Sequence, residues 1–243
     1  AAKIKGRAEI GGVIDHLDVM VAKYGVDVRL GWAPTADEVL ALQPEHVIVA
    51  TGSAPGDDIV GNLAQGITFT PGLDQDHVLS VWDVLDEDKP VGRHVAIVDD
   101  GEGGWKGIGL ALQLTEAGHE VDFVTPLPYV GAKLGPFSAN LAVPRIHRSG
   151  MHTHPFTTVT AIDGATVDIV EKGVAGTLCG IDTVILAGWH RPVTGLYFAL
   201  KNRGVPVERI GDAVASRTMM EAVHEGERAA RRIDLGEVAH LDQ

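Results

Sequence analysis

The chain of 243 residues is poor in cysteine and aromatic residues and has no long apolar run. Its one cysteine, Cys179, excludes an internal disulfide, a CxxC redox pair, a cysteine-rich zinc site and an all-cysteine iron-sulfur site. With no basic neighbour, Cys179 is expected to be a small apolar filler. The apolar runs, such as 47–50 and 184–187, fall far short of the roughly 20 residues of a membrane-spanning helix, and no signal-peptide pattern opens the chain. We therefore expect a cytoplasmic protein with no membrane partner.

Positive charge is also scarce. Lys and Arg number 20 against 33 Asp and Glu, a formal net charge of −13. Such a field repels phosphate backbones and argues against a nucleic-acid partner. Glycine, in contrast, is abundant, with 30 residues where the usual share is roughly 7 %. This excess favours the tight turns and close backbone approaches of nucleotide-binding folds.

Hydrophobic periodicity predicts an α/β chain. Thr35 and Glu38 have the spacing of a capping box, which marks the start of a short helix. A strand, a glycine-rich turn, a helix and a second strand over 94–124 form a βαβ unit. The other expected elements are helices over 10–21, 35–42, 196–203 and 218–233, and strands over 26–30, 46–50 and 183–186. A further short strand is expected to end at 210–212, a hairpin is expected over 159–170, and a loop or linker over 56–78.

The turn of the βαβ unit resembles a dinucleotide fingerprint, G-x-G-x-x-G, but an acidic residue stands at the position of the first glycine. The matching positions are Asp99, Gly101 and Gly104. Asp99 replaces the first glycine, and Asp100 and Glu102 add potential negative charge where a pyrophosphate would sit.

A second register of the same turn leaves the alternatives open. Gly101, Gly103 and Gly107 keep the glycines but space the third one residue too far. The following strand ends in Thr125 and Pro126, without the acid that usually meets the ribose. The turn therefore supports two readings, a working nicotinamide site and a retained Rossmann scaffold whose site has lapsed, and the charges favour the second.

Two other strand ends carry a nucleotide signal. One strand runs into Ala50-Thr51-Gly52 and another into Gly211-Asp212-Ala213. Flavoproteins use such ends to bring backbone near the flavin pyrophosphate and an Asp onto the ribityl chain. The alternatives are a simple strand-to-turn exit and a helix-capping or turn acid. Because both occur in this order around a βαβ unit, we take the cofactor-binding candidates to be Ala50, Thr51, Gly52, Gly211, Asp212 and Ala213.

Several stretches together resemble the C-terminal half of the trimethylamine dehydrogenase and 2,4-dienoyl-CoA reductase family of Old Yellow Enzyme-like NADH:flavin oxidoreductases. They are residues 7–15, 24–28, 47–55 and 210–213. In that family a barrel with FMN and an iron-sulfur cluster is joined to a glutathione-reductase-like pair of nucleotide domains. The stretches 98–101 and 116–121 look more like the trimethylamine dehydrogenase side. The resemblance implies binding of FAD or ADP.

The resemblance also implies a domain plan. A discontinuous FAD/ADP-type domain is expected over 1–88 and 190–243, with an NAD(P)-type Rossmann-like domain inserted over 89–189. The barrel, its FMN and cluster sites, and the first GxGxxG strand have no counterpart in this sequence. We therefore expect a fragment of a larger, homo-oligomeric oxidoreductase, inactive alone, rather than a separate subunit, whose sheet edges would be unpaired. The competing reading is a structural or assembly module whose nucleotide sites have lapsed.

Three histidines are a weak candidate for a metal site. His147, His152 and His154 are close in sequence, and the last two would share one strand face. No acid or cysteine completes a ligand set. We expect no metal site and no catalytic residue in this chain.

Overall fold

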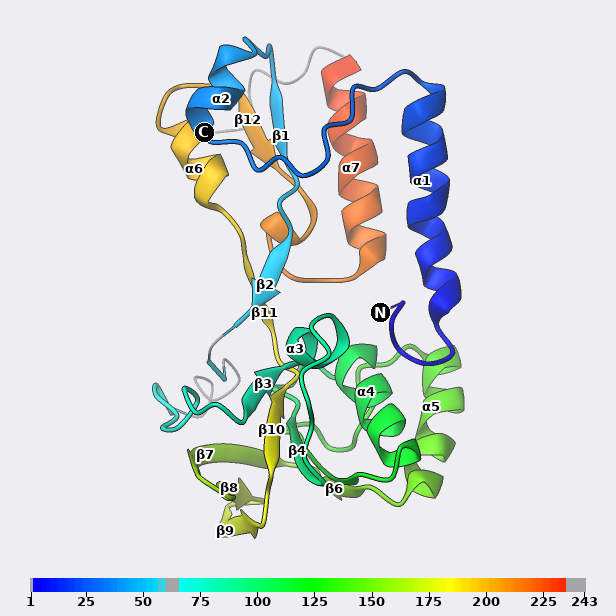
Figure 1. The fold of residues 1–243 in the computed structure, drawn as a ribbon, viewed down its shortest axis with the longest axis vertical. Helices are drawn as coiled ribbons and strands as arrows, with labels where there is room; N and C mark the ends of the chain where they lie inside the picture. Colours follow the sequence, from blue (N-terminus) through cyan, green and yellow to red (C-terminus); the bar gives the residue numbers. More distant parts are fainter. Residues whose placement is uncertain (1, 57, 60–65, 235–243) are drawn as a thin grey trace. The chain divides into compact units, whose positions relative to one another are not determined.

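The computed structural model describes residues 2–56, 58–59 and 66–234, which form two units (Figure 1). Unit 1 consists of residues 1–26 and 55–189, and unit 2 of residues 27–54 and 190–243. Unit 1 contains a parallel sheet with helices, so the expected α/β class with Rossmann-like architecture is confirmed. Among the described residues, no helix has the length and apolar character needed to cross a membrane.

The sheet of unit 1 has five parallel strands in the order β3-β10-β4-β5-β6. The out-of-sequence order is what βαβ crossovers produce. The predicted strands of the βαβ unit and the predicted strand over 183–186 are confirmed. The bounds are Val78–Ser80 (β3), Thr183–Leu186 (β10), His94–Val98 (β4), Glu120–Val124 (β5) and His152–His154 (β6).

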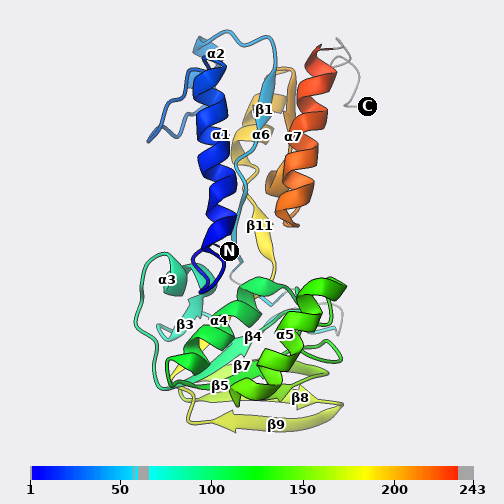
Figure 2. The ribbon, with the colours of Figure 1, turned by 90° about the vertical axis from the view of Figure 1, so that its right-hand side faces the viewer.

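Each face of this sheet is covered (Figure 2). Helices α3 (Val81–Leu85), α4 (Trp105–Glu116) and α5 (Pro136–Ser149) lie over one face and contact alternate strand residues such as Ile97 and Phe123. The other face packs Val98 and Val124 against an antiparallel sheet of β7 (Thr157–Asp163), β8 (Thr166–Glu171) and β9 (Val174–Cys179). Burial of both faces explains the nearly continuous apolar character of β4.

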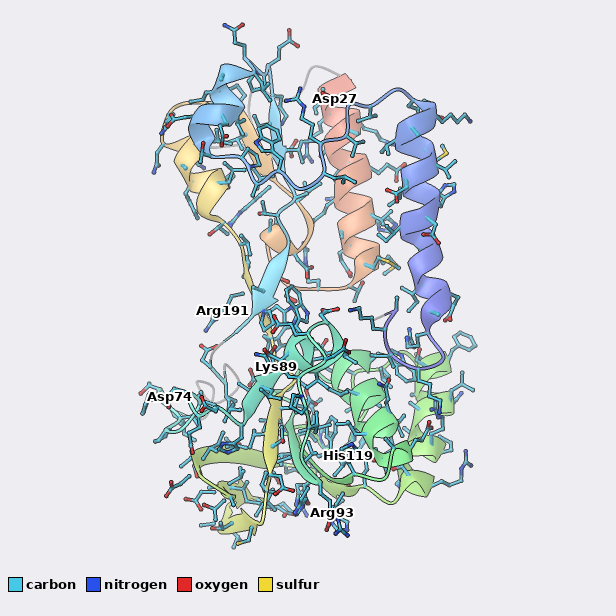
Figure 3. All side chains as sticks on the ribbon, viewed as in Figure 1. Asp27, Asp74, Lys89, Arg93, His119 and Arg191 are labelled. Carbon is cyan, nitrogen blue, oxygen red and sulfur yellow. The ribbon has the colours of Figure 1, made fainter. Side chains whose placement is uncertain are left out.

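Arg93 and His119, labelled in Figure 3, mark the amino-terminal end of the sheet. Arg93 precedes β4 and His119 precedes β5, and the Glu120 amide donates to the Arg93 carbonyl. The glycine-rich turn follows β4 and so lies at the opposite, carboxyl end, where α/β sheets bind ligands.

Unit 2 is built on two short strand pairs. Strand β1 (Val47–Val49) pairs in parallel with β12 (Val207–Arg209), and β2 (Ser53–Pro55) pairs with β11 (His190–Pro192). Its core joins Val49 and Val207 to Leu200. The predicted capping box of Thr35 and Glu38 is confirmed. The helices of this unit are α2 (Ala36–Ala41), α6 (Gly195–Lys201), the 3-10 turn η3 (Gly211–Ala213) and α7 (Met219–Asp234).

Two expectations about elements need correction. Residues 26–30 do not form a strand, because alternation alone cannot supply a neighbouring strand to bond with, and Val26, Val28 and Leu30 are exposed. Helix α5 was not expected, since Pro144 lies inside it and only Ala142 and Ile146 are buried. The predicted loop over 56–78 has residues 57 and 60–65 outside the described part of the chain.

Contacts group residues 1–26 and 55–88 with unit 1. The domain plan expected from the sequence is a different kind of division and stays a prediction. Strand β3 bonds to β10, and Ile4, in the segment before η1 (Ala8–Gly11) and α1 (Gly12–Lys23), is buried against Gly109 of α4. Pairing and packing across long sequence separations therefore assign these segments to unit 1.

Candidate nucleotide sites

The two predicted strand ends of unit 2 are adjacent. In the parallel β1–β12 pair, Val49 lies opposite Arg209, and the Ile210 amide donates to the Val49 carbonyl at 3.0 Å. Because carboxyl ends of parallel strands meet at one edge, residues 50–52 and 211–213 follow the sheet side by side. The structure thus brings together all six candidate residues, Ala50, Thr51, Gly52, Gly211, Asp212 and Ala213.

Asp212 is held in place by two hydrogen bonds. The Ser53 hydroxyl donates to Asp212 Oδ2 at 3.0 Å, and the Arg217 amide donates to Oδ1 at 3.1 Å. His190 Nδ1 lies 3.4 Å from the Ser53 hydroxyl. Sequence reasoning missed Ser53, although it directly follows Gly52 and its side chain can turn back to the same edge. The carboxylate is therefore oriented by the strand end on the other side of the site.

Gly211 is required where it stands. Its φ is +61°, and a Cβ there would lie 3.3 Å from the Cβ of Ala222 in α7. Its amide donates to Glu225 Oε2 at 2.6 Å, and Glu225 also pairs with Arg217. The hydrogen bonds of Glu225 and the close approach of α7 therefore fix the position of the 211–213 turn.

The first strand end is also fastened within the unit. Gly52 has φ +72°, and its carbonyl accepts the Val193 amide at 2.9 Å. The Thr51 hydroxyl donates to the Val193 carbonyl at 2.5 Å. Ala50 and Thr51 are exposed, so their backbone lies at the surface of the unit, where a ligand could approach.

In unit 1, the carboxylates of the glycine-rich turn are bonded to the turn's own amides. Asp99, which is 4 % exposed, accepts the Gly103 amide at 2.9 Å through Oδ1 and the Thr125 hydroxyl at 2.9 Å through Oδ2. Glu102 Oε2 accepts the Gly104 amide at 2.8 Å. Two amides at the amino end of α4 that could bind a phosphate therefore already donate to carboxyl groups of the turn itself.

The environment of Asp99 disfavours its charge. Burial raises the pKa of the Asp99 carboxyl, and the hydrogen bonds from Gly103 and Thr125 only partly oppose this effect. The Lys133 ammonium donates to the Gly101 carbonyl and lies 5.2 Å from the Trp189 ring centroid. The Lys133 cation thus lies beside the acidic turn.

The structural roles of the fingerprint glycines are performed in this turn by glycines that belong to both of the registers considered above. Gly101 and Gly103 have φ of +77° and +66°, which makes the turn tight. A Cβ on Gly107 would lie 3.0 Å from Ala187 Cβ on the sheet side, so Gly107 permits the close packing of α4. The scaffold function of the fingerprint is present even though Asp99 occupies its first position.

The predicted histidines have an acid that sequence spacing did not reveal. His152 and His154 share one face of β6, as expected, and Asp122 lies opposite on β5. His154 Nε2 and His94 Nε2 each lie 2.6 Å from a different oxygen of Asp122. Parallel pairing of β5 with β6 thus places an acid beside these histidines, a contact that local sequence spacing did not reveal. In the described ranges no group of three such side chains could hold a metal ion, and His147 lies on α5.

Opposed pKa shifts in this cluster predict a pH-dependent stability. The hydrogen bond to Asp122 raises the pKa of His154. Burial opposes ionisation of Asp122, but the hydrogen bonds and charges of His154 and His94 outweigh it and lower the pKa of that carboxyl. The stability that His154 contributes is fully present below its ordinary pKa of 6.5, and it is lost as the pH rises through the raised pKa. The stability that Asp122 contributes is fully present above its ordinary pKa of 3.8, and it is lost as the pH falls through the lowered pKa.

We therefore expect Asp122→Asn to lower the unfolding free energy by roughly 2–3 kcal/mol near pH 5–6, less than for a fully buried pair because the rings keep some solvent contact. The difference from the unmutated chain should shrink on both sides of that window. Urea unfolding monitored between pH 3 and 9 measures it. His152→Gln is the control, since that ring is 63 % exposed and 3.7 Å from Asp122. A difference that stays constant with pH would contradict this assignment.

Cys179 needs a correction. The thiol residue ends the edge strand β9 and is exposed, so it does not fill an apolar space. Edge strands have one unpaired side, and Cys179 lies where few neighbours can cover it.

Comparisons with known proteins agree with this architecture. The chain is 29 % identical over 234 residues to an NADH oxidase of Thermoanaerobacter brockii, covering 96 % of this chain and 35 % of that protein. Histamine dehydrogenase from Rhizobium sp. 4-9 superposes with a TM-score of 0.86 at 25 % identity, covering 96 % of this chain and 37 % of that one. The 6-hydroxypseudooxynicotine amine oxidase of Pseudomonas geniculata N1 gives 0.82 at 25 % identity, with 95 % and 35 % covered.

The chain thus spans about a third of the length of these relatives. Residues 5–225 match the family described as pyridine nucleotide-disulphide oxidoreductase. The matched range includes the strand ends at 50–52 and 211–213, and it also includes the βαβ unit with its glycine-rich turn. The chain belongs to the pyridine nucleotide-disulphide oxidoreductase family.

Proposed function

We propose that this chain is the nucleotide-binding part of a flavin-dependent oxidoreductase of the trimethylamine dehydrogenase and 2,4-dienoyl-CoA reductase type. It binds FAD or ADP at the strand ends of unit 2. The observation that carries the proposal is the adjacency of residues 50–52 and 211–213, with Asp212 oriented by Ser53 and Arg217. Relatives with dehydrogenase, oxidase and amine oxidase activities support this class of reaction.

The residues of unit 2 fit such a ligand. Exposed backbone at 50–51 and the glycine at 52 leave room for a close approach of a pyrophosphate, and Asp212 offers acceptors for hydroxyl groups. When bound, FAD supplies electron-transfer chemistry, and ADP supplies only a structural anchor. In this proposal the redox reaction occurs in a barrel with FMN and an iron-sulfur cluster, and the greater length of the relatives supports the existence of a further domain. The 243-residue chain by itself then has no turnover.

The role of Asp212 can be tested with two ligands. In the intact oxidoreductase we expect Asp212→Ala to weaken FAD binding about tenfold or more, the effect of losing a hydrogen-bonding carboxylate, and ADP binding much less. The reason is that the proposed contact is to the ribityl chain, which ADP lacks. Isothermal titration calorimetry of both ligands measures this, with Asp163→Ala in the exposed hairpin turn as the control. Equal losses for FAD and ADP would refute the assigned contact.

A second function is favoured by one observation in unit 1. The amides of Gly103 and Gly104 are bonded to Asp99 and Glu102, as in a nucleotide site that has lapsed. If unit 2 had lapsed as well, the chain would be a structural or assembly module. The nucleotide extracted from the purified intact protein separates the two proposals: bound FAD or ADP supports the first, and no nucleotide supports the second.

A further inference from the structure

A groove of about 300 Å³ lies in unit 1. Its walls are residues of the segment 4–9 and of helices α4 and α5, beginning at Trp105, the first residue of α4. Apolar side chains form much of its surface, including Ile4, Leu112 and Leu141. Its volume is at the lower end of the range for small-molecule sites.

Two buried donors beside this groove have no acceptor in the part of the chain that the structure describes. Arg7 and Trp105 both line the groove, and their Nε and Nε1 atoms are inaccessible to solvent and make no hydrogen bond with any described residue. The Arg7 guanidinium stacks on the Trp105 ring, with Cζ 4.5 Å from the ring centroid. Both groups can only donate, so they call for an acceptor. Leaving such donors unsatisfied is unfavourable, and both residues belong to the wall of the groove, where a ligand could supply the acceptor.

The charges around the groove indicate the sign of that acceptor. Glu116 is already paired with Lys5 at 2.8 Å and with Arg145 at 3.2 Å. Glu9 is the other acid of the lining, which therefore carries three cations and two carboxylates. The first turn of α5 contributes Phe137 and Ser138, and amino ends of helices attract anions.

We propose that this groove binds a small organic anion with an apolar body, whose carboxylate or similar oxygen accepts from Trp105 Nε1 and Arg7 Nε. The apolar body lies on Leu112 and Leu141. This site is independent of the nucleotide site proposed in unit 2, and neither proposal depends on the other.

The test uses 4-butylbenzoate as probe and 4-butylbenzyl alcohol as its uncharged analogue, titrated into the 243-residue chain by calorimetry. We expect the acid to bind at least about tenfold more tightly than the alcohol, as a charge-assisted hydrogen bond requires. Trp105→Phe keeps the ring and removes the donor, and should weaken the acid roughly tenfold but not the alcohol. Trp82→Phe, outside the groove, should change neither.

Arg7→Lys provides the second variant, because it keeps the charge and removes the Nε donor. It should weaken the acid several-fold, and thermal unfolding at an unchanged midpoint shows that the chain still folds. Three results would overturn the proposal: no binding of the acid at millimolar concentration, equal binding of acid and alcohol, or an unchanged affinity in Trp105→Phe. Self-association that blocks the groove, seen by sedimentation, would also overturn it by assigning this face to a second copy of the chain.

Discussion

NADH and NADPH are expected not to bind the glycine-rich turn of unit 1, and removing two charges there is expected to create binding. The amino end of a helix attracts an anion by about 0.3–1 kcal/mol. A carboxylate about 4 Å from a phosphate oxygen repels it by about 4 kcal/mol at an effective dielectric near 20. The amides of Gly103 and Gly104 are also already bonded to Asp99 and Glu102. Repulsion and competition therefore both oppose the pyrophosphate.

The variant to test combines Asp99→Gly with Glu102→Gln. Asp99→Gly restores the glycine of the fingerprint, and Glu102→Gln removes the charge at the first amides of α4. Relief of about 3 kcal/mol corresponds to a gain of roughly a hundredfold in affinity. Calorimetric titration of NADH and NADPH measures this gain.

The control removes the same charge elsewhere in unit 1, with Asp163→Gly in the hairpin and Glu120→Gln at the start of β5, both exposed. It should bind no better than the unmutated chain. Micromolar binding by the unmutated chain would overturn the prediction. An equal gain in the control would show that net charge, and not the turn, controls binding.

Gly72→Ala is expected to lower the unfolding free energy by about 2–5 kcal/mol, the sum of a left-handed backbone cost and overpacking. Gly72 has φ +87°, and a Cβ there would lie 1.9 Å from the Ile162 carbonyl oxygen. That oxygen belongs to β7, whose backbone cannot yield without breaking the hairpin. Urea unfolding followed by circular dichroism measures the change.

The surrounding contacts explain why this glycine matters. The Ile162 amide donates to the Pro71 carbonyl at 2.9 Å, and the Gln75 side chain donates to the Ile162 carbonyl at 2.8 Å. The Gly164 amide donates to Gln75 Oε1 at 2.9 Å. Residues 71–75 are thus hydrogen-bonded to the hairpin, and Gly72 permits this close approach.

The Gly164→Ala variant separates the cost of a left-handed backbone conformation from the cost of a steric clash. Gly164 has φ +54° with open space around its added Cβ, so only the left-handed cost of about 1–2 kcal/mol applies. Gly72→Ala should be clearly the more destabilising change. Equal losses in the two variants would mean that the contact with Ile162 relaxes without cost.

Sequence patterns predicted those parts of the fold that depend on nearby residues. The capping box at Thr35 and the β7–β8 hairpin were found because each needs only a few consecutive residues. The strand over 26–30 was wrongly predicted because its alternation has no partner strand. Helix α5 was missed because most of its residues are exposed and Pro144 interrupts its pattern.

The candidate nucleotide site was predictable in its residues but not in its contacts. Strand ends at 50–52 and 211–213 are recognisable one at a time, and parallel pairing of β1 with β12 brings them together. The hydrogen bond from Ser53 to Asp212 joins residues 159 positions apart, so no local spacing reveals it. The same holds for Asp122 and His154, which are 32 positions apart.

The sequence by itself determined the α/β class, the βαβ unit, the acidic glycine-rich turn and the six candidate residues of unit 2. These follow from periodicity, glycine spacing and charge, which are properties of short stretches. Only the tertiary structure decided that residues 1–26 and 55–88 group with unit 1 and that Asp99 and Glu102 bond to the amides of their own turn. It also decided that Arg7 Nε and Trp105 Nε1 have no acceptor among the described residues. The physical reason is that hydrogen-bond satisfaction and burial depend on which distant segments meet, and local patterns carry no information on that.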